Sequence, residues 1–169
     1  MESQVNVLFL CTHNSARSIL AEALLNHMGQ PRFKGFSAGS RPSAHQQPHP
    51  LALRVLSEGG ISTAGLCSKN WNDFALDSAP HMDLIITVCD NAAGEACPTW
   101  PGRPATAHWG YPDPSEGDAP EAEKLLGFEQ TFKAIEHKLQ WLISLPSNEI
   151  RAAVFATAAS TLMQYTVAP

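Results

Sequence analysis

Apolar residues along this chain fall into two patterns, short unbroken runs and sets with helical spacing. The runs at 5–10 and 82–89 are almost wholly apolar, which is typical of strands that are buried on both faces of a parallel sheet. Residues 33–39 predict a further strand between them. The segment 98–120 is rich in Pro and Gly and predicts mostly loop, with a short strand around 106–109.

The helically spaced residues predict three helices. The first contains Ile19 and ends at Gly29, the second covers 50–60, and the third covers 120–145 with one apolar face. Strands that alternate with helices predict an α/β fold, a doubly wound parallel sheet. Ligands of such sheets bind beyond the carboxyl ends of the strands, where the strand-to-helix loops gather.

The length of 169 residues is enough for one domain with a substantial core and too short for two ordinary domains. We place this single domain at 1–146. The Ala-rich tail at 147–169 predicts a C-terminal extension that is helical or partly disordered, and an oligomer contact is an equal alternative. We assign no chemistry to this tail.

Charge and composition narrow the class of protein. The formal net charge of -5 leaves no excess of basic residues to neutralise phosphates, so we expect no nucleic-acid binding. No apolar run is long enough to span a bilayer, and the N-terminus lacks the basic start of a signal peptide. We therefore expect a cytoplasmic monomer that does not bind membranes. Four cysteines in that reducing compartment indicate catalysis, redox cycling or metal binding rather than structural disulfides.

Cys11 and Arg17 enclose five small or polar residues between the first strand and the first helix. Free backbone N–H groups and the helix dipole favour an anion at such a helix start, and a guanidinium adds a two-pronged donor. The same field should lower the pKa of the Cys11 thiol and make it a nucleophile. The hydroxyl of Ser18 can donate to the thiolate, and Asn14 suits a left-handed position that curls the loop.

Three motifs carry a resemblance to a known family. "LFLCTHNSARS" resembles the active-site loop of the low-molecular-weight protein tyrosine phosphatase superfamily, and "ITVCDNAAGEACP" with "HWGYPDPS" is similar to the arsenate reductases of that superfamily. The resemblance covers roughly residues 5–145. It implies a phosphatase-like doubly wound fold and the reduction of arsenate to arsenite for arsenic detoxification.

The resemblance also implies roles for individual residues. Cys11 would form a thiol–arsenate adduct, and Asp113 would be the general acid that protonates the departing oxygen. Cys89 would attack Cys11 and release arsenite, and Cys97 would then attack Cys89 and pass the disulfide outward. No cofactor would be bound, because the electrons would come from thioredoxin or from a glutaredoxin/glutathione system. The residues implied to bind arsenate, or phosphate and sulfate in competition, are Thr12, His13, Asn14, Ser15, Ala16, Arg17 and Ser18.

Some relatives hold a potassium ion behind this loop through Asn, Glu, Ser and Asp side chains. Asn14, Glu22 and Ser37 match the first three, but Lys69 stands where the Asp is expected. An ammonium group there would replace and repel the cation, so we predict neither a bound metal nor dependence on potassium. The residues expected to support the loop are Asn14, Ser18, Glu22, Ser37 and Lys69.

Several alternatives stay open at this level. A tyrosine phosphatase would use the same loop and acid, although Ser115 stands where phosphatases usually present a Tyr. A zinc-binding protein could use Cys89, Cys97 and His108, but their spacing fits no common zinc motif. Taken alone, Asp113 could be a turn residue and Cys89 a buried strand residue. The gap between Cys89 and Cys97 is slightly longer than in the best-known thioredoxin-coupled members, which leaves the electron donor open, and Cys67 belongs to no motif.

Overall fold

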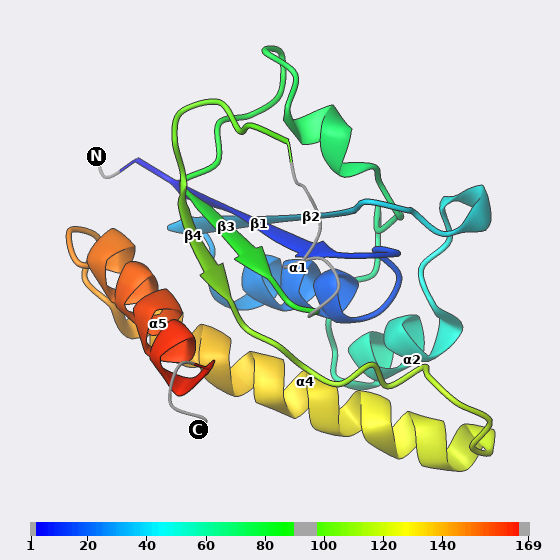
Figure 1. Ribbon diagram of the computed structural model, residues 1–169. Helices are drawn as coiled ribbons and strands as arrows, with labels where there is room; N and C mark the ends of the chain where they lie inside the picture. Colours follow the sequence, from blue (N-terminus) through cyan, green and yellow to red (C-terminus); the bar gives the residue numbers. More distant parts are fainter. Residues whose placement is uncertain (1–2, 90–97, 166–169) are drawn as a thin grey trace.

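A parallel sheet forms the centre of the computed structural model, which describes residues 3–89 and 98–165, without the side chains beyond residue 157. The strand order is β2-β1-β3-β4 (Figure 1). The strands are β1 (Val5–Cys11), β2 (Phe33–Gly39), β3 (Leu84–Thr87) and β4 (Ala105–His108). All four strands were predicted, but β3 is shorter than the predicted range 82–89. The flanking residues still follow β1, because the amides of Asp83 and Val88 donate to carbonyls of β1.

The helices that the sequence predicted are present with nearly the predicted bounds. They are α1 (Arg17–Met28), α2 (Pro50–Glu58), α4 (Glu121–Ser144) and, in the tail, α5 (Ile150–Tyr165). Pro50 occupies the first turn of α2, where its missing N–H costs nothing. Two short 3₁₀ helices, η1 (Ala44–Gln46) and η2 (Trp71–Phe74), were not predicted.

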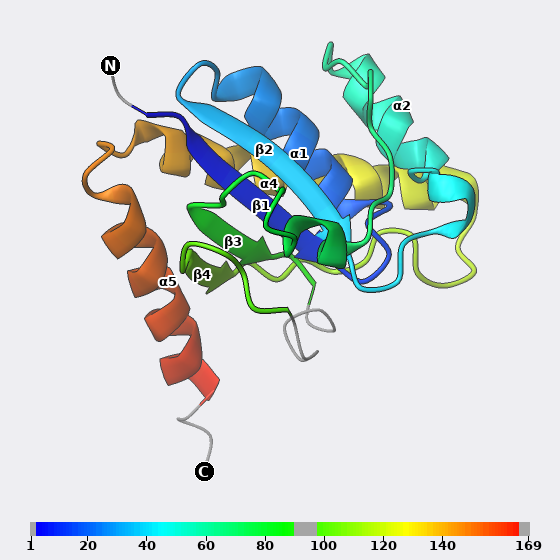
Figure 2. The ribbon, with the colours of Figure 1, turned by 90° about the horizontal axis from the view of Figure 1, so that it is seen from above.

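Alternate residues of β1 face two separate layers of core. Helices α1, α2 and α4 lie on one side of the sheet (Figures 1 and 2), and Val7 and Phe9 belong to the core cluster that contains these helices. Leu8 and Leu10 point the other way, into a smaller cluster that includes Trp71. The unbroken apolar run of the sequence is therefore explained by burial of this strand on both faces.

Helix α5 lies beside β4, which is an edge strand of the sheet (Figure 2). Its residues Ile150 and Val154 are buried in the main core cluster, so the beginning of the tail packs on the domain. A helix in this place covers the strand edge that would otherwise be open to pairing. The domain boundary at residue 146 stays a prediction. Within the described part of the chain, no helix has the length and apolar character needed to cross a membrane.

The register of the sheet brings the carboxyl ends of the strands together. Cys11 of β1 lies opposite Gly39 of β2, and Thr87 of β3 lies opposite His108 of β4. The order of the strands reverses at β1, because β2 lies on one side of it and β3 on the other. The loop after β1 therefore opens at the topological switch point, where doubly wound folds bind ligands.

Candidate active site

The loop between β1 and α1 begins at Cys11, which is buried at the end of its strand. Asn14 is fully buried with a φ of 48°, in the left-handed region predicted for it. Ala16 precedes α1 and offers no side-chain acceptor to the first amides of this helix. These amides are therefore available to an anion that sits over the helix start.

Three donors converge on the sulfur of Cys11. The backbone N–H of Asn14 lies 3.2 Å from the sulfur, and the Ser18 hydroxyl lies 2.8 Å from it. The amide of Lys69 donates to Oδ1 of Asn14, which leaves Nδ2 of Asn14 to donate to the Ser18 oxygen at 2.8 Å. Since Ser18 accepts this bond, its own hydrogen is free to donate to sulfur, as the sequence suggested. The third donor to the Cys11 sulfur is the backbone N–H of Ser18.

Burial raises the pKa of the Cys11 thiol above its ordinary value, and the nearby Cys89 adds to this. The hydroxyl and amide of Ser18 and the charge of Arg17 act in the opposite direction but do not outweigh burial. The prediction of a lowered pKa for the Cys11 thiol was therefore wrong. The residue is only 3% exposed, and removal of its sulfur from water penalises the charged thiolate.

Replacing Ser18 by Ala should raise the pKa of Cys11 further, because the thiolate loses its hydroxyl donor. We expect the alkylation rate of Cys11 by iodoacetamide at pH 8 to fall about tenfold, the effect of one hydrogen bond to a charged group. Mass spectrometry of the Cys11 peptide across a pH series measures this rate separately from the other thiols. An unchanged pH profile in the variant would show that the hydroxyl does not donate to the sulfur.

Arg17 joins the loop to the segment that carries Asp113. Its Nη1 donates to the carbonyl of Tyr111 at 2.9 Å, and its Nη2 lies 3.6 Å from the Asp113 carboxylate. Its Nε is buried and has no hydrogen-bond partner among the described residues. A buried donor without a partner is costly, so this N–H is suited to an oxygen of a bound anion.

Asp113, the residue expected to be the general acid, lies beside Arg17 of the anion loop. Partial burial raises the pKa of its carboxyl, but hydrogen bonds from the amide and hydroxyl of Ser115, with Arg17 and His13 nearby, lower it overall. The two Ser115 contacts measure 2.9 Å and 2.6 Å. Asp113 is therefore a carboxylate at neutral pH before an anion binds, and a bound anion that recruits Arg17 would raise its pKa.

Cys89 lies two residues beyond β3 and is buried. Its sulfur is 3.7 Å from the hydroxyl oxygen of Thr12, which places a second thiol beside the loop. Cys11 and Cys67 are free thiols. Cys97 lies outside the described residues, so neither its part in a relay nor the zinc alternative is tested. Within residues 3–89 and 98–165, no three His, Cys, Asp or Glu side chains are grouped as metal ligands would be.

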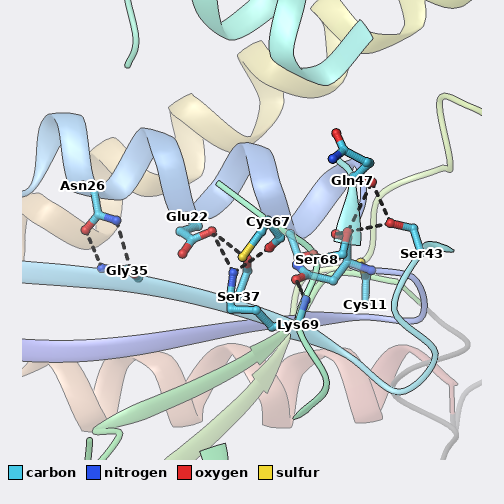
Figure 3. Close-up of polar contacts among 12 residues, drawn as sticks. Cys11, Glu22, Asn26, Gly35, Ser37, Ser43, Gln47, Cys67, Ser68 and Lys69 are labelled. Carbon is cyan, nitrogen blue, oxygen red and sulfur yellow. Dashed lines mark hydrogen bonds and ion pairs between the residues drawn. The ribbon is translucent and has the colours of Figure 1, made fainter. Parts of the chain in front are cut away.

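Behind the loop, Glu22, Ser37 and Lys69 form one polar cluster (Figure 3). The Ser37 hydroxyl donates to Glu22 at 2.7 Å, and the Lys69 ammonium lies 3.7 Å from the same carboxylate oxygen. This ammonium also donates to the carbonyl of Cys67 at 2.7 Å. Burial raises the pKa of Glu22, while Lys69 and Ser37 act against it. With an ammonium against its carboxylate, the cluster does not fit a potassium ion.

Three residues of the site were missed from the sequence. Gly39 ends β2 against the loop, where a Cβ would lie 2.8 Å from the Cys11 carbonyl oxygen and 2.9 Å from the amide nitrogen of Asn14. Tyr111 contributes only its carbonyl, which no side-chain pattern reveals. Ser68 is fully buried and touches the loop from a distant segment. Of these three residues, only Gly39 could have been noticed in the sequence, because it is a glycine at the end of a predicted strand.

Comparison with known proteins identifies the family. The family model for low molecular weight phosphotyrosine protein phosphatase matches residues 6–154, most of the chain. The chain belongs to this family. Its fold is also that of a family phosphatase from Vibrio cholerae, which aligns over 82% of this chain and 94% of that one with a TM-score of 0.64 and 21% identity.

Within the family, the relatives include arsenate reductases. The arsenate reductase of Bacillus subtilis is 33% identical over 140 residues, 83% of this chain and 95% of that protein. The arsenate reductase structure from Archaeoglobus fulgidus covers 82% of this chain and 99% of its own, with a TM-score of 0.63 and 29% identity. A thioredoxin-dependent arsenate reductase of Corynebacterium glutamicum covers 83% of this chain and 65% of its own, with a TM-score of 0.56 and 30% identity.

Proposed function

We propose that this protein reduces arsenate to arsenite with thiol electrons. The observation that carries the proposal is the second buried thiol, Cys89, held beside the anion loop through Thr12. Hydrolysis of a phosphate ester needs one thiolate and water, whereas reduction of arsenic needs two electrons and therefore a second thiol. The names of the relatives at 33% and 30% identity support the same reaction.

In the first step the Cys11 sulfur attacks arsenic, and an arsenate oxygen leaves as water. The balance is RSH + HAsO₄²⁻ → RS–AsO₃²⁻ + H₂O, with arsenic still at oxidation state five. The loop amides and Arg17 bind the anion's oxygens, and the buried Nε of Arg17, which has no partner in the described part of the chain, supplies one donor. Asp113 delivers the proton to the departing oxygen once anion binding has raised its pKa.

In the second step the Cys89 thiol attacks the Cys11 sulfur and the sulfur–arsenic bond breaks. The balance is RS–AsO₃²⁻ + R′SH → RS–SR′ + HAsO₃²⁻, so arsenic gains two electrons and the two thiols lose them. Cys97 would then attack Cys89, which frees Cys11 and leaves a Cys89–Cys97 disulfide for an external reductant. Each step exchanges one bond at sulfur, and no bound cofactor is required.

Thioredoxin is the electron donor that we propose, with a glutaredoxin/glutathione system as the alternative. The thioredoxin-dependent relative from Corynebacterium glutamicum supports the first choice. A cytoplasmic location and a monomeric state stay predictions from the sequence.

The test is arsenite release from arsenate by the purified protein, with thioredoxin, thioredoxin reductase and NADPH in one assay and glutaredoxin with glutathione in another. Many arsenite molecules per protein molecule in the first assay would support both the reaction and the donor. Arsenite release in the second assay alone would show that the glutaredoxin/glutathione system, and not thioredoxin, is the electron donor. Silence in both, with hydrolysis of an aryl phosphate through Cys11, would replace the proposal by the phosphatase alternative.

Weak phosphatase activity is a second function that the site favours, because phosphate and arsenate have nearly the same shape. The loop and Asp113 serve both reactions. Ser115, which stands where phosphatases usually present a Tyr, is turned toward Asp113 at 2.6 Å. The segment therefore contributes no aromatic wall at this position, and we expect phosphate esters to be poor substrates.

Arsenate reduction should not depend on potassium. The Lys69 ammonium supplies a fixed cation to Glu22, so an added potassium ion has no place to bind. We expect equal kcat/KM in potassium chloride and choline chloride at one ionic strength. A clear rise in potassium would show that Lys69 leaves the cluster in solution.

A further inference from the structure

The four carbonyl groups at positions 12–15 of the anion loop are held by donors from outside the loop. The amides of Arg41 and Ser43 donate to the carbonyls of Thr12 and His13 at 2.8 Å and 3.1 Å. The amide of His49 donates to the carbonyl of Ser15 at 2.8 Å. Because the C=O and the next N–H of a peptide unit point in opposite directions, each of these bonds turns an amide toward the anion.

The remaining carbonyl, that of Asn14, is held differently. Its donor is the hydroxyl of Ser68, at 2.6 Å. The other three donors are backbone amides, which no side-chain substitution removes. Ser68 is therefore the side chain on which the outward direction of the Asn14 carbonyl depends.

Ser68 is itself fixed in place. It is fully buried, its amide donates to the Gln46 carbonyl at 3.0 Å, and its hydroxyl oxygen lies 2.7 Å from that of Ser43. The Ser43 hydroxyl has its own acceptor in the Gln47 carbonyl at 2.6 Å, and Ser68 donates to the Asn14 carbonyl at 2.6 Å, far closer than its other carbonyl acceptor, that of Gln47 at 3.4 Å. Figure 3 shows Ser43, Gln47 and Ser68 grouped beside Cys11.

We propose that Ser68 is a positioning residue for the anion site, acting through Asn14. By holding the Asn14 carbonyl outward, it keeps the amide of Ser15 turned toward the anion. It also keeps Asn14 in its left-handed conformation, from which the backbone N–H reaches the Cys11 sulfur and Nδ2 reaches Ser18. The inference deepens the proposed site, but its test needs no arsenate turnover, so the two can fail separately.

The test compares Ser68→Ala with the wild type in two measurements. Calorimetry gives the Kd of inorganic phosphate, and iodoacetamide alkylation of the Cys11 peptide gives the pH profile of the thiol. We expect phosphate to bind about tenfold more weakly, since a buried carbonyl loses its partner and an amide its orientation. We also expect the alkylation profile to move to higher pH, because the donors to sulfur are loosened.

Thr131→Val is the matched control, because it removes another buried hydroxyl that donates to a carbonyl, that of Gly127 at 2.9 Å within α4. Both variants should lose some stability, but Thr131→Val should leave phosphate binding and the thiol profile unchanged. If Ser68→Ala does not fold, Ser43→Ala decides, with a shift of two- to threefold in the same direction. Unchanged phosphate binding and thiol profile in the folded serine variant would overturn the proposal, as would equal changes in Thr131→Val.

Discussion

Replacing Cys89 by Ser should abolish repeated arsenate reduction, with at least about a thousandfold loss of turnover, because the thiol that removes the electrons is missing. Cys11 would still form its adduct with arsenate, but a serine oxygen cannot take the place of sulfur in a disulfide. The adduct could only return to arsenate by hydrolysis. Arsenite release with the thioredoxin system measures the loss, and a Ser differs from Cys at this buried position by one atom.

The controls separate the relay from the anion loop. Cys89→Ser should keep its affinity for phosphate and any aryl phosphate hydrolysis, since both depend on the loop and Cys11. Cys11→Ser should lose hydrolysis and reduction together. Cys67→Ser should turn over normally, because the side chain of Cys67 has no part in the proposed relay. Sustained arsenite release by Cys89→Ser would contradict the relay. Loss of turnover in Cys67→Ser would show that the relay runs through Cys67.

The fold could be predicted from the sequence to the extent that burial leaves a local pattern. β1 is buried on both faces and is unbroken in its apolar character, and α4 carries one apolar face from Phe128 to Leu142. The 3₁₀ helix η2 had no such pattern, because only Trp71 and Phe74 of its residues enter a core. These two side chains are buried against the second face of the sheet, and this burial leaves no periodic pattern in the neighbouring sequence.

The site, too, could be predicted only where its residues lie close together in the sequence. Cys11, Arg17 and Asn14 stand in one short motif, so the loop and its left-handed residue were predictable. Ser68 reaches Asn14 across 54 positions of sequence, and nothing near it marks the contact.

The direction of the Cys11 pKa was also out of reach. A motif names the donors around a sulfur, but the shift depends on how far the folded chain removes that sulfur from water. Burial proved the larger effect.

Replacing Arg17 by Lys should lower kcat/KM for arsenate by roughly a hundred- to a thousandfold, the usual cost of removing an oriented donor to a developing oxyanion. An ammonium keeps the charge but loses the planar fork. In the native site this fork reaches the Tyr111 carbonyl through Nη1 and Asp113 through Nη2, and it keeps the buried Nε for the anion. A single ammonium cannot occupy these three directions at once.

Arg54→Lys is the matched control, because Arg54 is exposed on α2 and pairs with Glu58 at 2.9 Å, away from the loop. Surface pairs of this kind contribute little, so its kinetics should equal those of the wild type. Calorimetric titration with phosphate separates binding from chemistry in Arg17→Lys, and we expect weaker phosphate binding to account for part of the loss. If Arg17→Lys kept wild-type kcat/KM, charge alone would suffice at this position, and the oriented guanidinium would have no part in binding the anion's oxygens.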